Sequence, residues 1–248
     1  MCSNKKDLHV LPKKSEVILL NRRSTGIHGL NGLLDSGFPN HCGIGLIGPP
    51  GCGKSTFCKQ FIWEGLKNGE FGLYVAFDHA PDEIRESMKA FGWDVTPYEE
   101  EGLFIMIDCF NGSLGIKTGE KYYIENPLDM NEFMYVINKC VNEVASRLDP
   151  NTKIRVVLDS SSANANMQNL PMIFKVGKLL YSFVRKYNVV GLSVIHKGAQ
   201  NKLIETFMGQ MLDGSIEVVK KIENGQMNYY LWIDRMRGTA HSRNVHMF

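Results

Sequence analysis

One stretch of nine residues has the residue types and the spacing that bind phosphate groups. Gly48-Pro-Pro-Gly-Cys-Gly-Lys54-Ser55-Thr56 fits the pattern G-x-x-x-x-G-K-[ST]. Glycine allows backbone N–H groups to converge on phosphate oxygens, and the start of a helix adds the positive end of its dipole. Lys54 is expected to reach the β- and γ-phosphates, and Ser55 to offer its hydroxyl to Mg²⁺. The predicted phosphate contacts are Gly48, Pro49, Pro50, Gly51, Cys52, Gly53, Lys54, Ser55 and Thr56.

The sequence on both sides of this stretch supports a nucleoside-triphosphate site. Residues 43–47 are apolar, as expected of a buried strand, and residues 55–68 carry apolar side chains at helical spacing. A glycine-proline turn that matches by chance is the alternative, and the strand and helix disfavour it. Cys52 is expected to be a small filler in the loop. Oxidation of its thiol is expected to block nucleotide binding.

One acidic residue is placed to hold a metal ion. Asp159 closes the apolar run 154–159, which predicts a carboxylate at the carboxyl end of a strand beside the phosphate loop. Any aspartate can end a strand, so the assignment depends on its pairing with the phosphate loop. Ser55 and Asp159 are the predicted Mg²⁺ ligands.

Hydrolysis also requires a group that orients and deprotonates the attacking water. Asp78 follows the apolar run 71–77 and is the predicted general base, although it could simply begin the turn at Ala80-Pro81. His79 could assist or be exposed. His196 ends another apolar run and could sense the γ-phosphate or lie at the surface.

Composition bounds the class of protein. The 248 residues suffice for one large α/β domain, and the formal net charge of +2 gives no basic stripe of the kind that binds nucleic acid. No run of about 18 apolar residues is present, so no membrane span is expected. The first twenty residues are too charged for a signal peptide. Six cysteines without a C-x-x-C pair suggest reduced thiols and a cytoplasmic protein.

Strands that alternate with helices predict an α/β fold, with a mainly parallel, twisted sheet flanked by helices and antiparallel strands at the C-terminus. Residues 111–129 are predicted to be an excursion loop, and Gly37-Phe-Pro39 a turn. Strands are expected at 17–20, 43–47, 71–77, 103–108, 154–159, 189–196, 216–221, 228–234 and 244–248, with a turn at Asn224-Gly225. Helices are expected at 27–34, 55–68, 81–91, 130–148 and 170–186.

Several motifs resemble, in order and spacing, those of the KaiC-like ATPases of the RecA superfamily. They are Ser24-Thr-Gly-Ile-His-Gly-Leu-Asn-Gly-Leu-Leu34, Gly37-Phe-Pro39, the phosphate loop, Gly72-Leu-Tyr-Val-Ala-Phe-Asp78, Phe91-Gly-Trp93 and Arg235-Met-Arg-Gly-Thr-Ala-His241. The resemblance implies an N-terminal lead over residues 1–22 and a single KaiC-like, RecA-type ATPase domain over residues 23–248. The cyanobacterial clock protein of this family has two such domains in tandem.

The resemblance also implies ATP with Mg²⁺, and a homohexameric ring with ATP at each subunit boundary. In the family, residues matching the C-terminal motif contact the nucleotide of the neighbouring subunit, and lysine is usual at the position of Arg235. The nucleotide contacts implied in this way are Ala90, on the adenine side, with Arg235, Met236, Arg237, Thr239 and His241. Arg237 is expected to be catalytic in trans, together with Lys54 and Asp78 in the subunit that holds the ATP.

From the residues alone, the alternation of Arg235, Arg237, Thr239 and His241 predicts one side of a strand edge, where a solvated surface is the alternative. Phe91 and Trp93 could belong to the core.

Two departures from the family bear on activity. The family usually has two adjacent glutamates where this chain has Asp78-His79. Because the shorter aspartate lies one C–C bond further from the water, slow turnover, or binding with little hydrolysis, is expected. The kinase half of the clock protein has a Ser-Thr pair where this chain has Gly209-Gln210, and the nearest hydroxyl is that of Thr206. Autokinase activity is therefore not expected.

The main interpretation is an oligomeric ATP-driven switch or motor, and two alternatives stay open. One is an accessory protein of DNA recombination and repair, but the loop 160–168 has no Lys or Arg, and the loop 196–202 has only two lysines. DNA binding is expected to be weak or absent. The other is a non-hydrolysing, ATP-sensing scaffold for signalling proteins, which the Asp78-His79 change favours.

Overall fold

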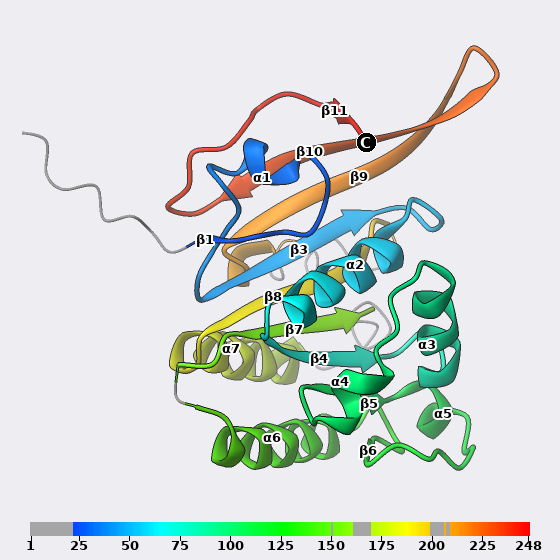
Figure 1. Cartoon of the computed structure of the whole chain (residues 1–248), viewed down its shortest axis with the longest axis vertical. Coiled ribbons are helices and arrows are strands. Elements are labelled where there is room, and N and C mark those ends of the chain that lie inside the picture. Colours follow the sequence, from blue (N-terminus) through cyan, green and yellow to red (C-terminus); the bar gives the residue numbers. More distant parts are fainter. Residues whose placement is uncertain (1–21, 150, 161–169, 199–205, 207–208) are drawn as a thin grey trace, which may run out of the picture.

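Alternating strands and helices build a mixed sheet whose central strands are parallel (Figure 1). The computed structural model describes residues 22–149, 151–160, 170–198, 206 and 209–248. Within these residues the large sheet has nine strands in the order β11-β10-β9-β3-β8-β7-β4-β5-β6. They are β3 (Cys42–Gly48), β4 (Phe71–Ala76), β5 (Phe104–Asp108), β6 (Tyr122–Tyr123), β7 (Ile154–Asp159), β8 (Val189–His196), β9 (Gly214–Glu223), β10 (Gln226–Met236) and β11 (His246–Met247).

The pairing from β9 through β6 is parallel, whereas β10 is antiparallel to both β9 and β11. The α/β fold with antiparallel C-terminal strands is thus confirmed. A small sheet pairs β1 (Arg22–Arg23) with β2 (Phe38–Pro39). The helices are α1 (Leu30–Leu33), α2 (Lys54–Lys67), α3 (Pro81–Ala90), α4 (Thr96–Glu100), α5 (Phe110–Ser113), α6 (Met130–Arg147) and α7 (Leu170–Lys186).

Helices cover both faces of the sheet because alternate side chains of each strand point to opposite faces. In β4, Tyr74 and Ala76 belong to the apolar cluster that contains α2, and Leu73 and Val75 to the cluster that contains α6. A strand that is buried on both faces reads as a continuous apolar run, which is why β4 was predictable.

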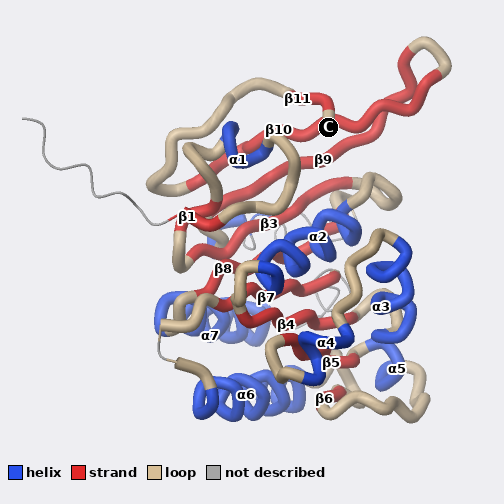
Figure 2. The backbone as a smooth tube through the Cα atoms, in the orientation of Figure 1, coloured by secondary structure: helices blue, strands red, loops and turns tan. Residues whose placement is uncertain are grey.

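The C-terminal hairpin extends beyond the end of the neighbouring strand β3 (Figure 2). Its two-residue turn is Asn224-Gly225, as predicted, and both residues have positive φ angles, 53° and 76°. This conformation matches the right-handed twist of the two strands, and asparagine followed by glycine adopts it readily.

Some local predictions were wrong. The stretch 111–129 contains part of α5 and the short strand β6, and α4 was not predicted. Phe38 and Pro39 form a strand with Arg22 and Arg23 rather than only a turn. Phe91 is 54% exposed at the end of α3 and stacks on Trp93, so it does not belong to the core. The predicted strand 17–20 lies outside the described residues.

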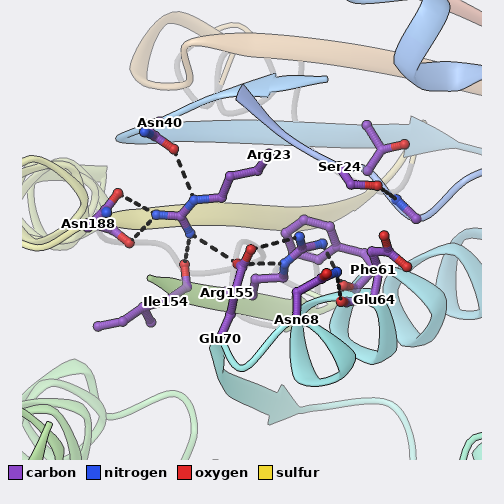
Figure 3. Close-up of polar contacts among 12 residues, drawn as sticks. Arg23, Ser24, Asn40, Phe61, Glu64, Asn68, Glu70, Ile154, Arg155 and Asn188 are labelled. Atoms are coloured by element: carbon purple, nitrogen blue, oxygen red, sulfur yellow. Dashed lines mark hydrogen bonds and ion pairs between the residues drawn. The ribbon is translucent and has the colours of Figure 1, made fainter. Parts of the chain in front are cut away.

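A buried cluster of charges holds the amino ends of the strands together (Figure 3). Arg155 of β7 donates two hydrogen bonds to Glu70, of 2.9 and 3.2 Å, and a third of 2.8 Å to the carbonyl oxygen of Phe61. Its guanidinium also lies over the Phe61 ring, 4.6 Å from the centroid. A Cβ added at Gly65 would lie 2.4 Å from Cδ of Arg155, so glycine in α2 makes room for this side chain.

Arg23 brings β1 to the same cluster. Its guanidinium donates to the carbonyl oxygens of Ile154 and Asn188, at 2.7 and 2.5 Å, and forms a 3.5 Å ion pair with Glu70. The pKa of Arg23 is lowered to about 10, because burial and the neighbouring charge of Arg155 outweigh the opposing effect of Glu70. One carboxylate therefore compensates two buried guanidiniums, and Glu70 is essential to the cluster.

We expect Glu70→Gln to lower the free energy of unfolding by about 3–5 kcal/mol, because it leaves two buried cations without a counter-charge. Urea unfolding followed by circular dichroism measures the change. Glu64→Gln is the matched control, since Glu64 of α2 pairs with Lys67 near the surface and its loss should cost less than about 1 kcal/mol. Equal losses in the two variants would contradict the role given to Glu70.

Candidate functional site

The predicted phosphate loop joins the carboxyl end of β3 to the start of α2. Gly51 and Gly53 have φ angles of 72° and 88°, in the left-handed region that favours glycine. Pro50, Gly51 and Gly53 are exposed, whereas Cys52 and Lys54 point inward and are buried. The loop therefore presents its backbone to solvent, as phosphate binding requires.

Gly48 allows the loop to lie close to the neighbouring strand. A Cβ added at Gly48 would lie 2.2 Å from the carbonyl oxygen of Val218 in β9 and 2.8 Å from Sγ of Cys52. Cys52 is fully buried, which matches the predicted filler role. Glycine at position 48 is thus a requirement of packing between β3 and β9 as well as of phosphate binding.

Lys54 folds back beneath the loop. Its Nζ donates to the carbonyl oxygens of Gly48 and Pro49, at 2.9 and 2.7 Å, and lies 3.7 Å from Sγ of Cys52. Only 4% of the residue is exposed. The ammonium is therefore fixed directly under the exposed backbone of the loop.

The two predicted metal ligands are in contact. Ser55 Oγ donates a 3.2 Å hydrogen bond to Oδ1 of Asp159, and the Tyr74 hydroxyl donates one of 2.5 Å to Oδ2. Asp159 is buried, and burial raises the pKa of its carboxyl group, with the nearby Asp78 acting in the same direction. A cation at this point would offset the cost of the buried negative charge.

The cation of Lys59 also lies near this carboxylate and opposes the rise in its pKa. Lys59 Nζ donates a 2.8 Å hydrogen bond to Ser87 of α3, so it connects α3 to α2. Burial lowers the pKa of Lys59.

The predicted general base lies at the same edge of the sheet. Asp78 follows β4, and its Oδ2 lies 3.3 Å from Nε2 of His196 at the end of β8. His79 turns away and lies 3.5 Å from Glu83 of α3, with 56% of its side chain exposed. The structure thus brings Asp78 and His196 together and separates His79 from them.

A lysine of β9 that sequence reasoning did not assign lies against the loop. A Cβ added at Gly51 would be 2.9 Å from Nζ of Lys220, so this second ammonium is close to the phosphate loop. The parallel pairing of β9 with β3 brings it there. The sequence alone does not show that Lys220 lies near the loop, because this depends on which strand pairs with β3.

The tail residues lie at the amino ends of the parallel strands, whereas the phosphate loop lies at their carboxyl ends. Met236 pairs with Gly214, and Gly214 pairs with Ile44 near the amino end of β3, whereas the phosphate loop follows its carboxyl end. The distance along the strand from Ile44 to Gly48 alone is roughly 13 Å. Arg237, which follows Met236, is therefore far from the phosphate loop of its own chain.

The tail departs from the predicted alternation, because β10 ends at Met236 and Arg237 begins a turn. Met236 is 4% exposed and belongs to the core. The Arg235 guanidinium donates to the carbonyl oxygens of Gly209 and Leu212. Thr239 accepts a 2.6 Å hydrogen bond from Arg22, and His241 Nδ1 lies 3.0 Å from the Ser242 carbonyl oxygen. The four polar side chains therefore do not line one strand edge.

Asp213 fixes Arg237 in its own chain. This buried carboxylate accepts hydrogen bonds from the backbone N–H of Gly43, at 3.0 Å, and from Arg185 of α7, at 2.5 Å. Arg237 lies 3.9 Å from the same group, and half of its side chain is exposed. The other guanidinium nitrogen, Nη2, donates a 3.2 Å hydrogen bond to the carbonyl oxygen of Gln210, so both ends of the guanidinium have a partner in their own chain.

Ala90 lies at the exposed end of α3, beside the stacked rings of Phe91 and Trp93, whose centroids are 4.9 Å apart. Its place on the adenine side stays a prediction.

Comparison with known proteins identifies the family. A model of the KaiC ATPase family matches residues 23–248. The chain belongs to the KaiC ATPase family. It is similar to UPF0273 proteins of Pyrococcus horikoshii, 34% identical over 93% of this chain and 91% of the relative, and Thermotoga maritima, 32% identical over 93% of both chains. It is also similar to the crystal structure of a KaiC-like protein of Pyrococcus horikoshii, with a TM-score of 0.72, 25% identity and coverage of 92% and 94% of the two chains.

The resemblance stated from the sequence is thereby confirmed, and membership of the KaiC family implies nucleotide binding. In the described part of this KaiC-family chain, no helix is long and apolar enough to cross a membrane. Across those same residues, no group of three or more His, Cys, Asp or Glu side chains could hold a metal ion.

We expect Lys220→Ala to weaken ATP binding about tenfold, because a charge lost beside the phosphates costs on the order of 1 kcal/mol. Titration with a fluorescent ATP analogue measures the change. Lys221→Ala is the control, since its Nζ lies over the Tyr230 ring, 5.5 Å from the centroid. If both variants bind as tightly as the wild type, Lys220 does not contact the nucleotide.

We expect Asp159→Asn to retain or raise the melting temperature without nucleotide. The raised pKa of Asp159 means that its ionised form costs stability at neutral pH, and this cost falls as the pH falls. Mg²⁺-ATP should stabilise the wild type by about 5–10 °C at 100 times its Kd, and Asp159→Asn should lose this shift. Thermal unfolding with and without Mg²⁺-ATP measures both effects.

Asp108→Asn is the control for this experiment. Asp108 is a buried carboxylate at the end of β5 that accepts hydrogen bonds from Asn111. Its substitution should lower the melting temperature and preserve the shift with Mg²⁺-ATP. A full shift in Asp159→Asn would exclude Asp159 as a metal ligand.

Proposed function

We propose that this chain is an ATPase that hydrolyses ATP slowly within a homo-oligomeric ring, with ATP at each subunit boundary, and works as a switch or motor. One observation carries the proposal. The phosphate loop, Asp159 and Asp78 share one edge of the sheet, whereas Arg237 lies at the other edge. A second copy can complete such a divided site.

In this proposal the loop backbone and Lys54 bind the β- and γ-phosphates. The positive φ angles of Gly51 and Gly53 expose the backbone, and the buried Lys54 supplies a fixed cation beneath it. The loop backbone is exposed before the nucleotide binds, whereas Lys54 would exchange its hydrogen bonds to the carbonyl oxygens of Gly48 and Pro49 for bonds to phosphate.

Ser55 and Asp159 are the proposed ligands of Mg²⁺. Their oxygens lie 3.2 Å apart, and hard oxygen donors are what Mg²⁺ prefers. When bound, Mg²⁺ would offset the negative charge of the phosphates. The buried carboxylate of Asp159 would hold the ion beside the loop, and Tyr74 would hold the carboxylate.

Asp78 is the proposed acceptor of the proton of the attacking water. It is at the ligand-binding edge of the sheet, and 35% of its side chain is exposed. Because the aspartate side chain is one C–C bond shorter than that of glutamate, we infer slow turnover. Because Gly209-Gln210 stands where the kinase half of the clock protein has a Ser-Thr pair, we infer no autokinase activity.

Arg237 is proposed to act on the ATP of the neighbouring subunit. Half of its side chain is exposed, and its guanidinium would exchange its contacts with Asp213 and the Gln210 carbonyl oxygen for the phosphates of the neighbouring subunit. A guanidinium in this place would neutralise charge that develops on the phosphates. A hexamer is the assembly that we propose, with residues 23–248 as one ATPase domain, residues 1–22 as a lead, and a cytoplasmic location.

A non-hydrolysing scaffold for signalling proteins is the second candidate, and the short Asp78 side chain favours it. A role in DNA recombination has little support from the net charge of +2, and the loop residues 161–169 and 199–205 lie outside the described residues. Measurement of phosphate release distinguishes the scaffold from the ATPase. Affinity for single-stranded DNA at physiological salt tests the other.

Subunit mixing tests the proposal. Lys54→Ala should abolish ATP binding, and Arg237→Ala should cut turnover by up to about 10³-fold while leaving ATP binding intact. In a random 1:1 mixture, about a quarter of the boundaries combine an intact loop with an intact Arg237, so phosphate release should partly return. Arg243→Ala, an exposed tail residue, is the control and should keep full activity.

If mixed oligomers form and no activity returns, Arg237 does not act in trans. If the wild type binds ATP and releases no phosphate, the scaffold replaces the ATPase as the conclusion.

A further inference from the structure

Within the described residues, the carboxylate of Asp78 has a polar contact with His196. Asp78 lies in a bend after β4 with 35% of its side chain exposed, so packing does not fix its orientation. Among the described residues, the hydrogen-bond partner found for its carboxylate is His196, with Nε2 3.3 Å from Oδ2. A carboxylate accepts, so Nε2 of the imidazole carries the hydrogen.

His196 is itself fixed by the sheet. It is the last residue of β8 and pairs with Gly48, the residue that begins the phosphate loop. Lys197, next in the chain, donates a 3.2 Å hydrogen bond from its backbone N–H to the Gly48 carbonyl oxygen. The imidazole therefore extends from a backbone position whose distance to the loop is set by the parallel ladder.

The contact between Asp78 and His196 spans the carboxyl end of β7, the strand that ends at the proposed metal ligand Asp159. In the sheet β7 lies between β8 and β4, and Asp159 is its last residue. The side chains of Asp78 and His196 come from the two flanking strands and meet at the carboxyl end of β7. The carboxylate of Asp78 is thus held by His196, a residue whose backbone is fixed next to the phosphate loop.

We propose that His196 is a positioning residue for Asp78, an inference that rests on the proposed ATPase function. With Oδ2 held by His196, Oδ1 is the oxygen that accepts the proton of water. In the step, the water oxygen bonds to the γ-phosphorus, the bond from that phosphorus to the β–γ bridging oxygen breaks, and ADP leaves. The water proton passes to Oδ1 of Asp78 and then to solvent.

This role differs from direct sensing of the γ-phosphate by His196. A positioning residue affects the rate of the chemical step and leaves ATP affinity unchanged, because it acts through Asp78. A sensor contributes to affinity as well, because it touches the ligand.

The test compares turnover with binding in the full chain. His196→Ala should lower kcat about 10- to 100-fold, as expected when a reacting group is misplaced by about 1 Å, with less than a twofold change in ATP affinity. His196→Gln retains a donor and should recover most of kcat. His79→Ala is the matched control and should behave as the wild type, because His79 faces Glu83.

Two kinetic outcomes would overturn the inference. They are an unchanged kcat in His196→Ala, or a loss of ATP affinity as large as the loss of kcat/KM. Absence of phosphate release from the wild type is the separate failure of the proposed function. In that event melting temperatures of Asp78→Ala, His196→Ala and the double variant test the pair: non-additive shifts support it, and additive shifts refute it.

Discussion

Parallel pairing of β3, β8, β7 and β4 is the constraint on which the candidate site depends. It brings the carboxyl ends of four strands to one edge of the sheet. The phosphate loop follows β3, His196 ends β8, Asp159 ends β7, and Asp78 follows β4. Each of these strands is held by hydrogen bonds to its neighbours, so the polar groups at the edge keep their spacing without contacts among all of them. The hydrogen bond from Ser55 to Asp159 then fixes α2 relative to β7.

The amino ends of the same strands carry charges with a different task. Arg23, Glu70 and Arg155 are buried there, and their hydrogen bonds join β1, β7 and the residue before β4. Asp213 makes a second such junction, between β3, α7 and the tail. Glu70 favours the observed arrangement, because any other would leave the buried guanidiniums of Arg23 and Arg155 without a counter-charge. The buried charges thus lie at the amino ends of the parallel strands, and the phosphate loop and Asp159 lie at their carboxyl ends.

The sequence predicted the elements whose signal is local. A phosphate loop is readable because glycines, lysine and serine have fixed spacing, and β4 and β7 because both of their faces are buried. The contacts of Lys220 with the loop and of Arg155 with Glu70 depend on strand order, which one sequence does not give. Arg155 did carry a hint, since arginine within an apolar strand needs a buried partner. The tail was predicted as a regular strand, and the turn after Met236 was missed although Gly238 follows closely.

The reversal of the chain at Asn224-Gly225 decides what one subunit can do alone. Up to β9 the strands from β3 onward run in one direction, so every strand end delivers its side chains to the edge of the phosphate loop. β10 runs back, and the residues after it arrive at the opposite edge. An arginine side chain, about 7 Å long, cannot span the distance of roughly 13 Å along β3 that separates the tail from the phosphate loop. The antiparallel hairpin therefore places the tail arginines where they can reach the nucleotide of another copy and not that of their own chain.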